Sequence, residues 1–273
     1  MTRSQRLLLL IPTTTYRTED FVEAARELDV DLVIASDRPN VMAGEFPDHL
    51  LTLPFRDPEA AAREMRGYAA RRPLDAVVPV DDATTVVASA IGEALGLRVN
   101  PLAAARATRD KLVMRELLAG AGVASPPFTT VRLEEDARAA AARMRYPCVL
   151  KPLGLSASRG VIRADDPAGF VAALERIRVI LSAPDVVEQG VPTDRILVEG
   201  FVPGGEVALE GLLEDGALRT LALFDKPDPL DGPFFEETIY VTPSRLPEAT
   251  QAAVADGAAR AARALGLSDG AVH

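Results

Sequence analysis

The sequence has few of the residues that build disulfides or metal centres. Its 273 residues include one cysteine, Cys148, so no intrachain disulfide can form and we expect a reducing compartment. Cys148 lies within an apolar stretch and is interpreted as a core residue. One of the two histidines, His49, stands next to apolar residues without a second His or Cys at ligand spacing, which favours a packed or surface side chain over a metal ligand.

Positive charge and long apolar runs are also scarce. Thirty Lys and Arg residues against 40 Asp and Glu residues give a formal net charge of −10, which disfavours nucleic acid or an anionic membrane as the main partner. No apolar run approaches the length of a membrane span, and residues 7–11 are too short for a signal sequence. We therefore expect a soluble, cytoplasmic protein that binds no nucleic acid and no membrane.

Hydrophobic residues make up 48% of the sequence, which is enough for two domains. The first hundred residues alternate between apolar runs of strand length (7–11, 31–35, 50–53 and 76–80) and helical patterns (19–28, 57–71 and 84–95). This order predicts an α/β fold that starts with a Rossmann-like domain over residues 1–100, in which helices cover a parallel sheet. No Gly-x-Gly-x-x-Gly follows the first strand, so this domain lacks a dinucleotide fingerprint.

Polar residues follow the ends of two of these predicted strands. Residues 13–15 and the pair Asp81 and Asp82 are expected at the carboxyl edge of the sheet, where open parallel sheets bind ligands. They are therefore candidate substrate contacts. Asp82 or a neighbouring residue can instead cap the helix that begins near residue 84, and both interpretations stay open at this point.

A second domain is expected over residues 101–273. Asn100 and Pro101 interrupt the alternation, and a Ser-Pro-Pro connector follows at residues 125–127. Beyond it we expect strands at 129–131, 146–151, 160–162 and 196–198, helices at 134–145 and 165–177, and a surface loop at 182–194. Asp165 and Asp166 precede a proline and are interpreted as a helix cap. Apolar runs at 207–213 and 217–224 flank Glu-Asp-Gly and predict an antiparallel hairpin.

The stretch YPCVLKPLGLSASRG, residues 146–160, reads as an apolar strand that ends in a lysine and enters a loop of small residues. Lys151 at the strand end is a fixed point charge. Gly154, Ser156, Ser158 and Gly160 allow backbone N–H groups and hydroxyls to approach an anion closely. The stretch therefore predicts a phosphate grip, with an ordinary turn as the alternative.

A pair of carboxylates follows the predicted strand at 196–198. Glu199 is separated by seven positions from Glu206, across a turn that contains Gly200 and Val202. A strand end followed by a tight turn places backbone groups along the edge of a bound base, and the second carboxylate can accept both hydroxyls of a ribose. The alternative is a strand edge with solvated acids.

Three motifs in this order resemble the ATP-grasp superfamily: Asp-Lys before a helix at residues 110–111, the lysine and small-residue loop at 151–160, and the acidic pair at 199 and 206. The resemblance implies an ATP-grasp α+β domain after the Rossmann-like one, with a lid subdomain at about 127–195 and an incomplete C-terminal subdomain. Within the superfamily, FDKPDPLDGPFFEETIYVTPS at 224–244 resembles carboxylate-amine ligases that act on amino acids, a group that includes carnosine-synthase-like enzymes.

The resemblance implies an ATP-dependent carbon–nitrogen ligase with small-molecule carboxylate and amine substrates. A carboxylate attacks the γ-phosphate of ATP, an acyl phosphate forms with release of ADP, and an amine displaces phosphate. Two alternatives stay open. The first is a non-catalytic ATP-binding module or an inactive fragment that lacks the metal site, and the second is ATP-dependent phosphorylation or carboxylation without amide formation. A homodimer is a further open option.

The resemblance also implies roles for individual residues. Lys111 and Lys151 contact the nucleotide phosphates under the loop from Gly154 to Gly160. Glu199, Gly200 and Val202 face the adenine, and Glu206 binds the ribose. These residues, with Gly154, Ser156, Ser158 and Gly160 in the loop, make up the implied cofactor-binding set.

The segment 224–244 contains the residues that are candidates for phosphoryl transfer and for substrate binding. Lys226 is the implied catalytic residue, close to the terminal phosphate, although a salt bridge to Asp225 or Asp228 is the alternative. Glu236 and Glu237 either receive a substrate ammonium or are solvated loop charges.

One part of the superfamily pattern is not found. Magnesium-binding carboxylates, commonly Glu-x-Asn on a late strand, follow a helix such as the one predicted at 248–265. The resemblance therefore implies ATP and Mg²⁺ as cofactors, with the metal ligands beyond His273. It also implies that the chain is a fragment of a longer enzyme.

Overall fold

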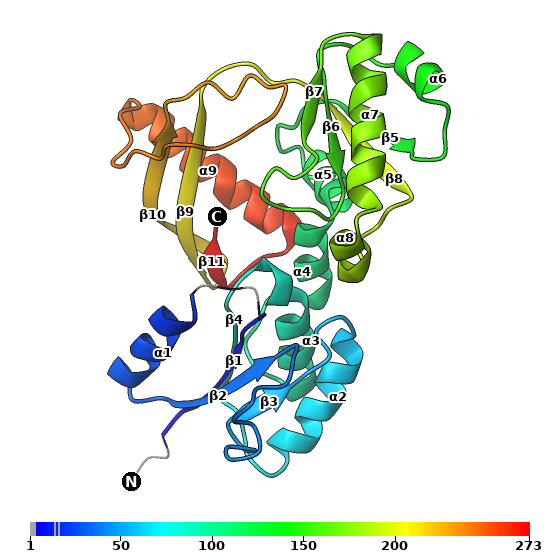
Figure 1. Ribbon diagram of the computed structural model, residues 1–273. Helices are drawn as coiled ribbons and strands as arrows, with labels where there is room; N and C mark the ends of the chain where they lie inside the picture. Colours follow the sequence, from blue (N-terminus) through cyan, green and yellow to red (C-terminus); the bar gives the residue numbers. More distant parts are fainter. Residues whose placement is uncertain (1–3, 14, 16) are drawn as a thin grey trace. The chain divides into compact units, whose positions relative to one another are not determined.

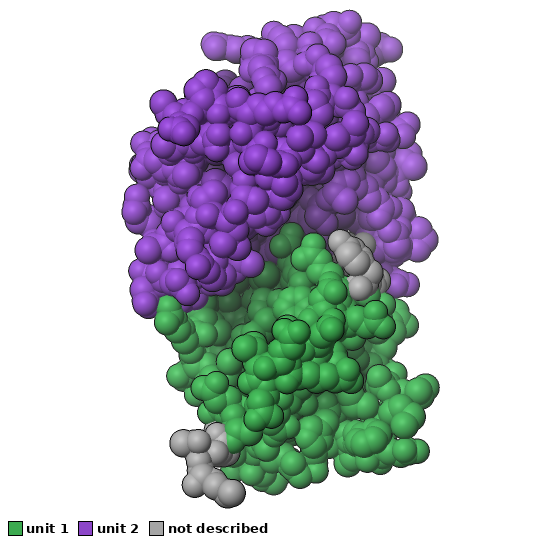
Figure 2. Space-filling model, turned by 90° about the vertical axis from the view of Figure 1, so that its left-hand side faces the viewer, with its two compact units in different colours: residues 1–106 green, residues 107–273 purple. Residues whose placement is uncertain are grey.

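The computed structural model describes residues 4–13, 15 and 17–273. It shows a mixed α/β fold, as predicted, and the chain divides into two compact units, residues 1–106 and 107–273 (Figures 1 and 2). Each unit has its own hydrophobic core. No helix in the described part of the chain has the length and apolar content needed to cross a membrane.

The first unit is built on a four-stranded parallel sheet in the order β3-β2-β1-β4. Its strands are β1 Arg6–Leu10, β2 Asp31–Ser36, β3 Leu50–Thr52 and β4 Ala76–Pro79. Its helices are α1 Thr18–Glu27, α2 Pro58–Ala69, the short 3₁₀ helix η1 Asp82–Thr84 and α3 Thr85–Leu95, followed by α4 Leu102–Arg109. The order of strands and helices confirms the predicted Rossmann-like alternation.

Local sequence signals set the helix ends in this unit. The Asp57 carboxylate accepts a 2.9 Å hydrogen bond from the Ala60 N–H, and Pro58 occupies the first turn of α2. Gly96 ends α3 in the left-handed conformation with φ 67°. The core places Met65 of α2 and Ile91 of α3 against Leu8 of β1.

The second unit contains a four-stranded antiparallel sheet, which we call the lid sheet, in the order β5-β8-β6-β7. Its strands are β5 Phe128–Arg132, β6 Cys148–Pro152, β7 Ile162–Ala164 and β8 Arg195–Gly200, accompanied by helices α6 Ala137–Ala142, α7 Pro167–Leu181 and α8 Pro184–Gln189. Helix α7 packs on one face of the sheet, where its fully buried Phe170 joins Leu150 and Ile196 in one core (Figure 1). Because strand side chains alternate, Lys151 and Glu199 lie on the opposite face.

The same unit contains a three-stranded sheet in the order β10-β9-β11, made of β9 Glu206–Glu214, β10 Ala217–Lys226 and β11 Gly270–Val272. Helix α9 Glu248–Leu265 contacts β9, β10 and the helix α5 Lys111–Gly120 (Figure 1). Asp215 and Gly216 form the hairpin turn with positive φ of 51° and 79°, which matches the handedness that tight hairpins require. The predicted hairpin is therefore confirmed.

Two sequence predictions in the lid are wrong in their extent. The helix predicted at 134–145 shrinks to α6, because the Leu133 and Glu135 carbonyls accept hydrogen bonds of 2.8 and 2.6 Å from Arg178 and the helix starts only at the Asp136 cap. The predicted loop at 182–194 contains α8, which begins at Pro184 and ends at Gly190 with φ 67°. Proline and glycine mark the two ends of this short helix.

Candidate nucleotide and substrate site

Lys111 is fixed at the start of α5 by its neighbour. Asp110 caps the helix, since its carboxylate accepts hydrogen bonds of 2.9 Å from the Leu112 N–H and 3.2 Å from the Val113 N–H. The Lys111 backbone N–H donates to the Leu153 carbonyl at 3.2 Å, and its Nζ donates to the Leu155 carbonyl at 2.5 Å. Lys111 is thus tied to the loop that follows β6.

The ammonium of Lys111 lies in a desolvated and positively charged environment. Burial, with the repulsion of Lys151 as the next cause, lowers the pKa of Lys111 to about 8. A lysine with this pKa changes its charge in the mildly alkaline range, so its attraction for an anion depends on pH in that range.

Lys151 and Glu199 meet because β6 and β8 pair in a register that puts Val149 opposite Glu199. Lys151, two residues further along β6, lies on the same face, and its Nζ is 2.6 Å from Glu199 Oε2. The other carboxylate oxygen, Oε1, accepts a 2.5 Å hydrogen bond from Nε of Arg115. We call Lys111, Arg115, Lys151 and Glu199 the basic cluster.

The basic cluster holds its carboxylate ionised inside the protein. The Glu199 side chain is only 4% exposed. Burial by itself raises the pKa of Glu199, but the hydrogen bond from Arg115 and the charge of Lys151 outweigh it, so this pKa lies below its ordinary value. Three cations around one carboxylate leave the cluster with net positive charge, which suits a polyphosphate.

Sequence reasoning missed Arg115. The available signal was its spacing, because Arg115 lies four residues after Lys111 and the two therefore share one face of α5. That Arg115 binds Glu199, 84 positions away in the sequence, follows only from the packing of α5 against the lid sheet.

The loop at residues 153–160 contains three residues in the left-handed conformation. Ala157 and Ser158 have positive φ of 51° and 53°, and Gly160 has φ 78°. A side chain on Gly160 would bring Cβ to 2.7 Å from Cγ of Pro152, so the close approach of loop and strand requires glycine there. Gly154 packs less tightly, since its Cβ would lie 3.2 Å from Val191. Ser156 and Ser158 are exposed.

The two ends of this loop are anchored differently. Leu155 is held by Lys111, whereas Arg159 forms an ion pair with Asp185 of α8. The loop therefore lies against both α5 and α8, with its exposed serine hydroxyls between the anchors.

The segment after Glu199 offers part of the predicted base contact. The N–H groups of Gly200 and Phe201 donate to the carbonyls of Pro127 and Pro147 at 2.9 and 3.1 Å, so these two amides are engaged within the protein. Val202 follows with 66% of its surface exposed. Glu199 itself has both carboxylate oxygens bound to cations.

Lys226 lies in a second cluster, between carboxylates. The hairpin register puts Lys226 opposite Glu206, and Nζ is 2.7 Å from Glu206 Oε1 and 2.5 Å from Glu237 Oε1. Nζ lies 5.3 Å from the centre of the Tyr240 ring, and the Tyr240 hydroxyl bonds to Glu237. Burial lowers the pKa of Lys226, but the hydrogen bonds to Glu206 and Glu237 outweigh it and raise this pKa above its ordinary value.

The salt-bridge partners suggested for Lys226 from the sequence are wrong. Asp225 instead accepts a 2.8 Å hydrogen bond from the Arg245 N–H and a bond from Ser244, and Asp228 bonds to Thr238. Of the two loop carboxylates considered, Glu237 joins Lys226, whereas Glu236 is exposed.

Two regions of the chain match known protein families. Residues 144–273 match the ATP-grasp domain, and residues 22–98 match the ATP-grasp N-terminal domain. The chain belongs to the ATP-grasp family.

Relatives in the ATP-grasp family include amino-acid ligases. The chain is 32% identical over 195 residues to an alanine–anticapsin ligase from Bacillus subtilis, an alignment that covers 66% of this chain and 40% of that protein. It is 31% identical over 183 residues to a formate-dependent phosphoribosylglycinamide formyltransferase from Mycolicibacterium vanbaalenii, with 66% of this chain and 43% of that protein covered. The chain thus spans less than half the length of these relatives.

A solved ATP-grasp structure resembles the chain over almost all of its length. The crystal structure of an L-amino acid ligase from Bacillus licheniformis aligns with a TM-score of 0.77 and 25% identity, covering 99% of this chain and 62% of that protein. This similarity and the two domain matches confirm the predicted resemblance to ATP-grasp carboxylate-amine ligases.

Candidate residues in the N-terminal ATP-grasp unit have structural contacts. Asp81 caps η1, with its carboxylate 3.0 Å from the Ala83 N–H, and Asp82 begins that helix. The Thr13 N–H donates to Asp37 at 3.0 Å, whereas residue 14, which was also a candidate, lies outside the described residues. His49 lies 3.4 Å from Asp31.

The remaining candidates in the lid have structural contacts as well. Asp166 caps α7 through the Gly169 N–H at 2.7 Å, as expected, while Asp165 pairs with Arg163. Cys148 is buried, and burial raises the pKa of its thiol to about 11, so it is a core residue.

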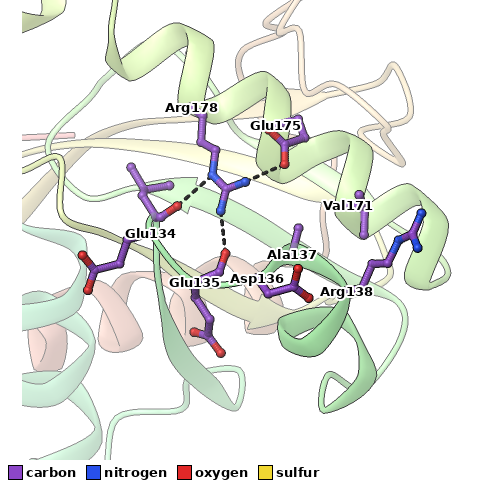
Figure 3. A pocket seen from close by; sticks show the side chains of 9 residues that line it. Glu134, Glu135, Asp136, Ala137, Arg138, Val171, Glu175 and Arg178 are labelled. Carbon is purple, nitrogen blue, oxygen red and sulfur yellow. Dashed lines mark hydrogen bonds and ion pairs between the residues drawn. The ribbon is translucent and has the colours of Figure 1, made fainter.

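A hollow of about 500 Å³ in the second unit contains none of the predicted site residues. It lies between α6 and α7 and is lined mainly by charged side chains (Figure 3). Arg178 at its centre donates to the Leu133 and Glu135 carbonyls and to Glu175 at 2.5 Å. These bonds give Arg178 a structural role in fixing the loop before α6.

The described residues contain no group of three or more His, Cys, Asp or Glu side chains that could hold a metal ion. The carboxylates within the two clusters, Glu199, Glu206 and Glu237, are all paired with cations. The described residues therefore do not form a magnesium site.

Proposed function

We propose that this chain supplies the ATP-binding part of an ATP-dependent carboxylate-amine ligase that acts on amino acids. The observation that carries the proposal is the basic cluster, in which lysines from two distant segments converge beneath the loop at 153–160. The relatives named as amino-acid ligases support the choice of reaction class within the ATP-grasp family.

In the proposed complex, Lys111 and Lys151 bind the ATP phosphates, and Gly154, Ser156, Ser158 and Gly160 line the loop above them. Lys151 already faces Glu199, so the phosphate joins an ion pair whose carboxylate is shared with Arg115. Gly200 and Val202 lie next to Glu199 on the segment proposed to border the adenine. The exposure of Val202 supports this proposal.

The proposed chemistry uses two displacements. An oxygen of the substrate carboxylate attacks the γ-phosphorus, the bond from that phosphorus to the ADP oxygen breaks, and an acyl phosphate and ADP result. The amine nitrogen of the second substrate then attacks the acyl carbon, phosphate leaves, and the nitrogen loses a proton. Lys226, held by Glu206 and Glu237, is proposed to neutralise charge that develops on the transferred phosphoryl group.

A non-catalytic ATP-binding module is the second candidate. Under this proposal the chain binds ATP through the same basic cluster and releases no ADP.

The first experiment measures ATP binding by calorimetry for the wild type and Lys151→Ala. We expect a rise in Kd of at least about tenfold, since the lysine contributes a charge-assisted contact to phosphate. Arg132→Ala is a matched control, because Arg132 is 64% exposed and lies on β5, away from Lys151. An unchanged Kd for Lys151→Ala would contradict the assignment of the site.

The second experiment measures ADP release with mixtures of amino acids. An amide-forming ligase needs both a carboxylate and an amine, and it yields an amide that mass spectrometry detects. ADP release with a carboxylate alone and no amide points to phosphorylation or carboxylation instead. Binding of ATP without ADP release under any mixture points to the non-catalytic module.

A further inference from the structure

The long connection between β10 and α9, residues 227–247, reaches the edge of the lid sheet. Strand β7 is the last strand of that sheet, and its outer side is taken by this connection, which we call the β10–α9 loop. The Arg163 N–H donates to the Pro233 carbonyl at 2.9 Å, and Ile162 forms a β-bridge with Phe234. In Figure 1 the loop is the orange segment between β10 and α9.

The side chain of Arg163 strengthens this contact. Its Nη1 donates to the Asp231 carbonyl at 2.7 Å. The backbone of Gly232, with φ 89°, lies so close that an added Cβ would be 2.9 Å from the Arg163 Cβ. Arg176 of α7 lies over the Phe234 ring at 4.9 Å, so the loop is held from two lid elements.

The guanidinium of Arg163 also contacts the segment proposed to border the adenine. It lies 4.0 Å from the centre of the Phe201 ring, two residues after Glu199. Its Nε donates to Asp165 at 2.7 Å, which fixes the plane of the group. The Arg163 guanidinium therefore contacts Phe201, in the segment after Glu199 that we call the adenine segment, with the face of its plane, and it contacts the β10–α9 loop through Nη1.

The far end of the contact reaches the Lys226 cluster. Glu237, three residues after Phe234, binds Lys226 at 2.5 Å. Three residues span at most about 11 Å, so the contact of Phe234 with the lid and that of Glu237 with Lys226 lie close together along the loop. The loop is tied down again beyond Glu237, where Val241 and Asp225 exchange backbone hydrogen bonds of 2.9 and 3.0 Å.

We propose that Arg163 is a positioning residue that links the adenine segment to the β10–α9 loop. Nucleotide binding that orders Phe201 then also fixes the loop and the Glu237 carboxylate next to Lys226. By linkage, a ligand that binds at Glu237 strengthens nucleotide binding by the same factor. The proposal rests on the proposed function for the nature of the nucleotide.

Hydrogen exchange of this chain, followed by mass spectrometry, tests the link in two steps. Without nucleotide, Arg163→Ala should speed exchange of the amides in residues 231–238 by about tenfold, the effect expected for loss of a hydrogen bond to a charged donor. With the ATP analogue AMP-PNP and MgCl₂, exchange in these residues should slow in the wild type and not in Arg163→Ala. The Kd of the variant for AMP-PNP should rise by less than about threefold, because Arg163 touches no phosphate in this scheme. Arg132→Ala, at the opposite edge of the lid sheet, should behave like the wild type in both steps.

A second variant removes the contact from the loop side. Gly232→Ala forces a Cβ against Arg163 and should give the same faster exchange and the same loss of nucleotide-dependent protection, even if Arg163→Ala fails to fold. Unchanged exchange in both variants overturns the proposal, and so does nucleotide binding to the wild type without protection of residues 231–238. Failure of the wild type to bind AMP-PNP at all overturns the proposed function and the linkage together, while the first step still reports whether Arg163 holds the loop.

Discussion

Replacing Arg115 by methionine should make the folded protein less stable, by an amount that depends on pH. Arg115 supplies one of the two cations that bind Glu199, whose side chain is 4% exposed. Methionine keeps much of the apolar stem of arginine and removes its charge. The buried carboxylate then keeps only Lys151 as a direct partner.

The size of the effect follows from the burial of Glu199. Removing one partner of a buried ion pair costs about 3–5 kcal/mol when the remaining charge has no other partner. Because Lys151 remains at 2.6 Å, we expect about 2 kcal/mol, close to the value of a hydrogen bond to a charged group. For a unit of this size that loss lowers Tm by about 4–8 °C.

The pH dependence has a defined sign. In the wild type the folded-state pKa of Glu199 lies below its ordinary 4.5, so its pairing stabilises the fold above about pH 4.5, and that stability is lost as the pH falls through the folded-state pKa. Without Arg115 the effect of burial raises the folded-state pKa. The stability deficit of the variant should therefore be full at pH 8 and should shrink as the pH falls towards 5, where a protonated Glu199 needs no second cation.

Chemical denaturation at pH 8 and pH 5 measures this deficit directly. The double variant with Glu199→Gln should recover most of the loss at pH 8, since the charge that needs Arg115 is gone. Arg260→Met is the matched control, because Arg260 is 56% exposed and forms only a 3.4 Å surface pair with Asp256. Equal deficits at both pH values, or strictly additive effects of the two substitutions, would refute the reasoning.

Three further predictions concern the two clusters and the loop. Since the pKa of Lys111 is about 8, its side chain loses its positive charge above that pH, and ATP affinity should fall by up to about tenfold per pH unit between pH 8 and 9.5. Lys111→Arg should remove this pH dependence. Calorimetry that finds no change of affinity with pH in the wild type would contradict the prediction. Gly160→Ala should destabilise the protein by about 1–3 kcal/mol, because φ is 78° and the added Cβ would lie 2.7 Å from Pro152. Gly257→Ala in α9, where an added Cβ would have no atom within 4 Å, should be neutral or stabilising in the same denaturation experiment. Lys226→Met should reduce ADP release by about 100-fold. It also leaves the Glu206 and Glu237 carboxylates facing each other without a cation, which should lower stability. The double variant with Glu237→Gln should therefore regain stability but not activity.

The sequence predicted elements whose signals are local. Helix α9 has the predicted bounds, 248–265, because alanine-rich helical spacing and the glycine after it lie within one segment. The position of Lys151 near the end of an apolar strand was predicted for the same reason. Gly160 in the loop after it has φ 78°, which glycine favours, whereas the positive φ of Ala157 and Ser158 runs against the preference of these residue types.

The partners of the charged residues could not be predicted in this way. Lys226 was expected to pair with its neighbours Asp225 or Asp228, yet it binds Glu206 across the hairpin and Glu237 on the loop. Arg115 meets Glu199 only because α5 packs against the lid sheet. Such pairings depend on tertiary packing, which the spacing of charges along the chain does not encode.

The pairing of β6 with β8 limits how the length of this protein can change in evolution. A one-residue insertion or deletion between Val149 and Lys151, or between Leu197 and Glu199, would turn one charged side chain into the core that α7 covers and leave the other without its partner. We therefore expect length differences among related sequences to collect in segments such as 133–136 and 190–194, and the strands that carry the two charges to keep their length. Substitution can still tune the basic cluster, but insertion and deletion there would remove it.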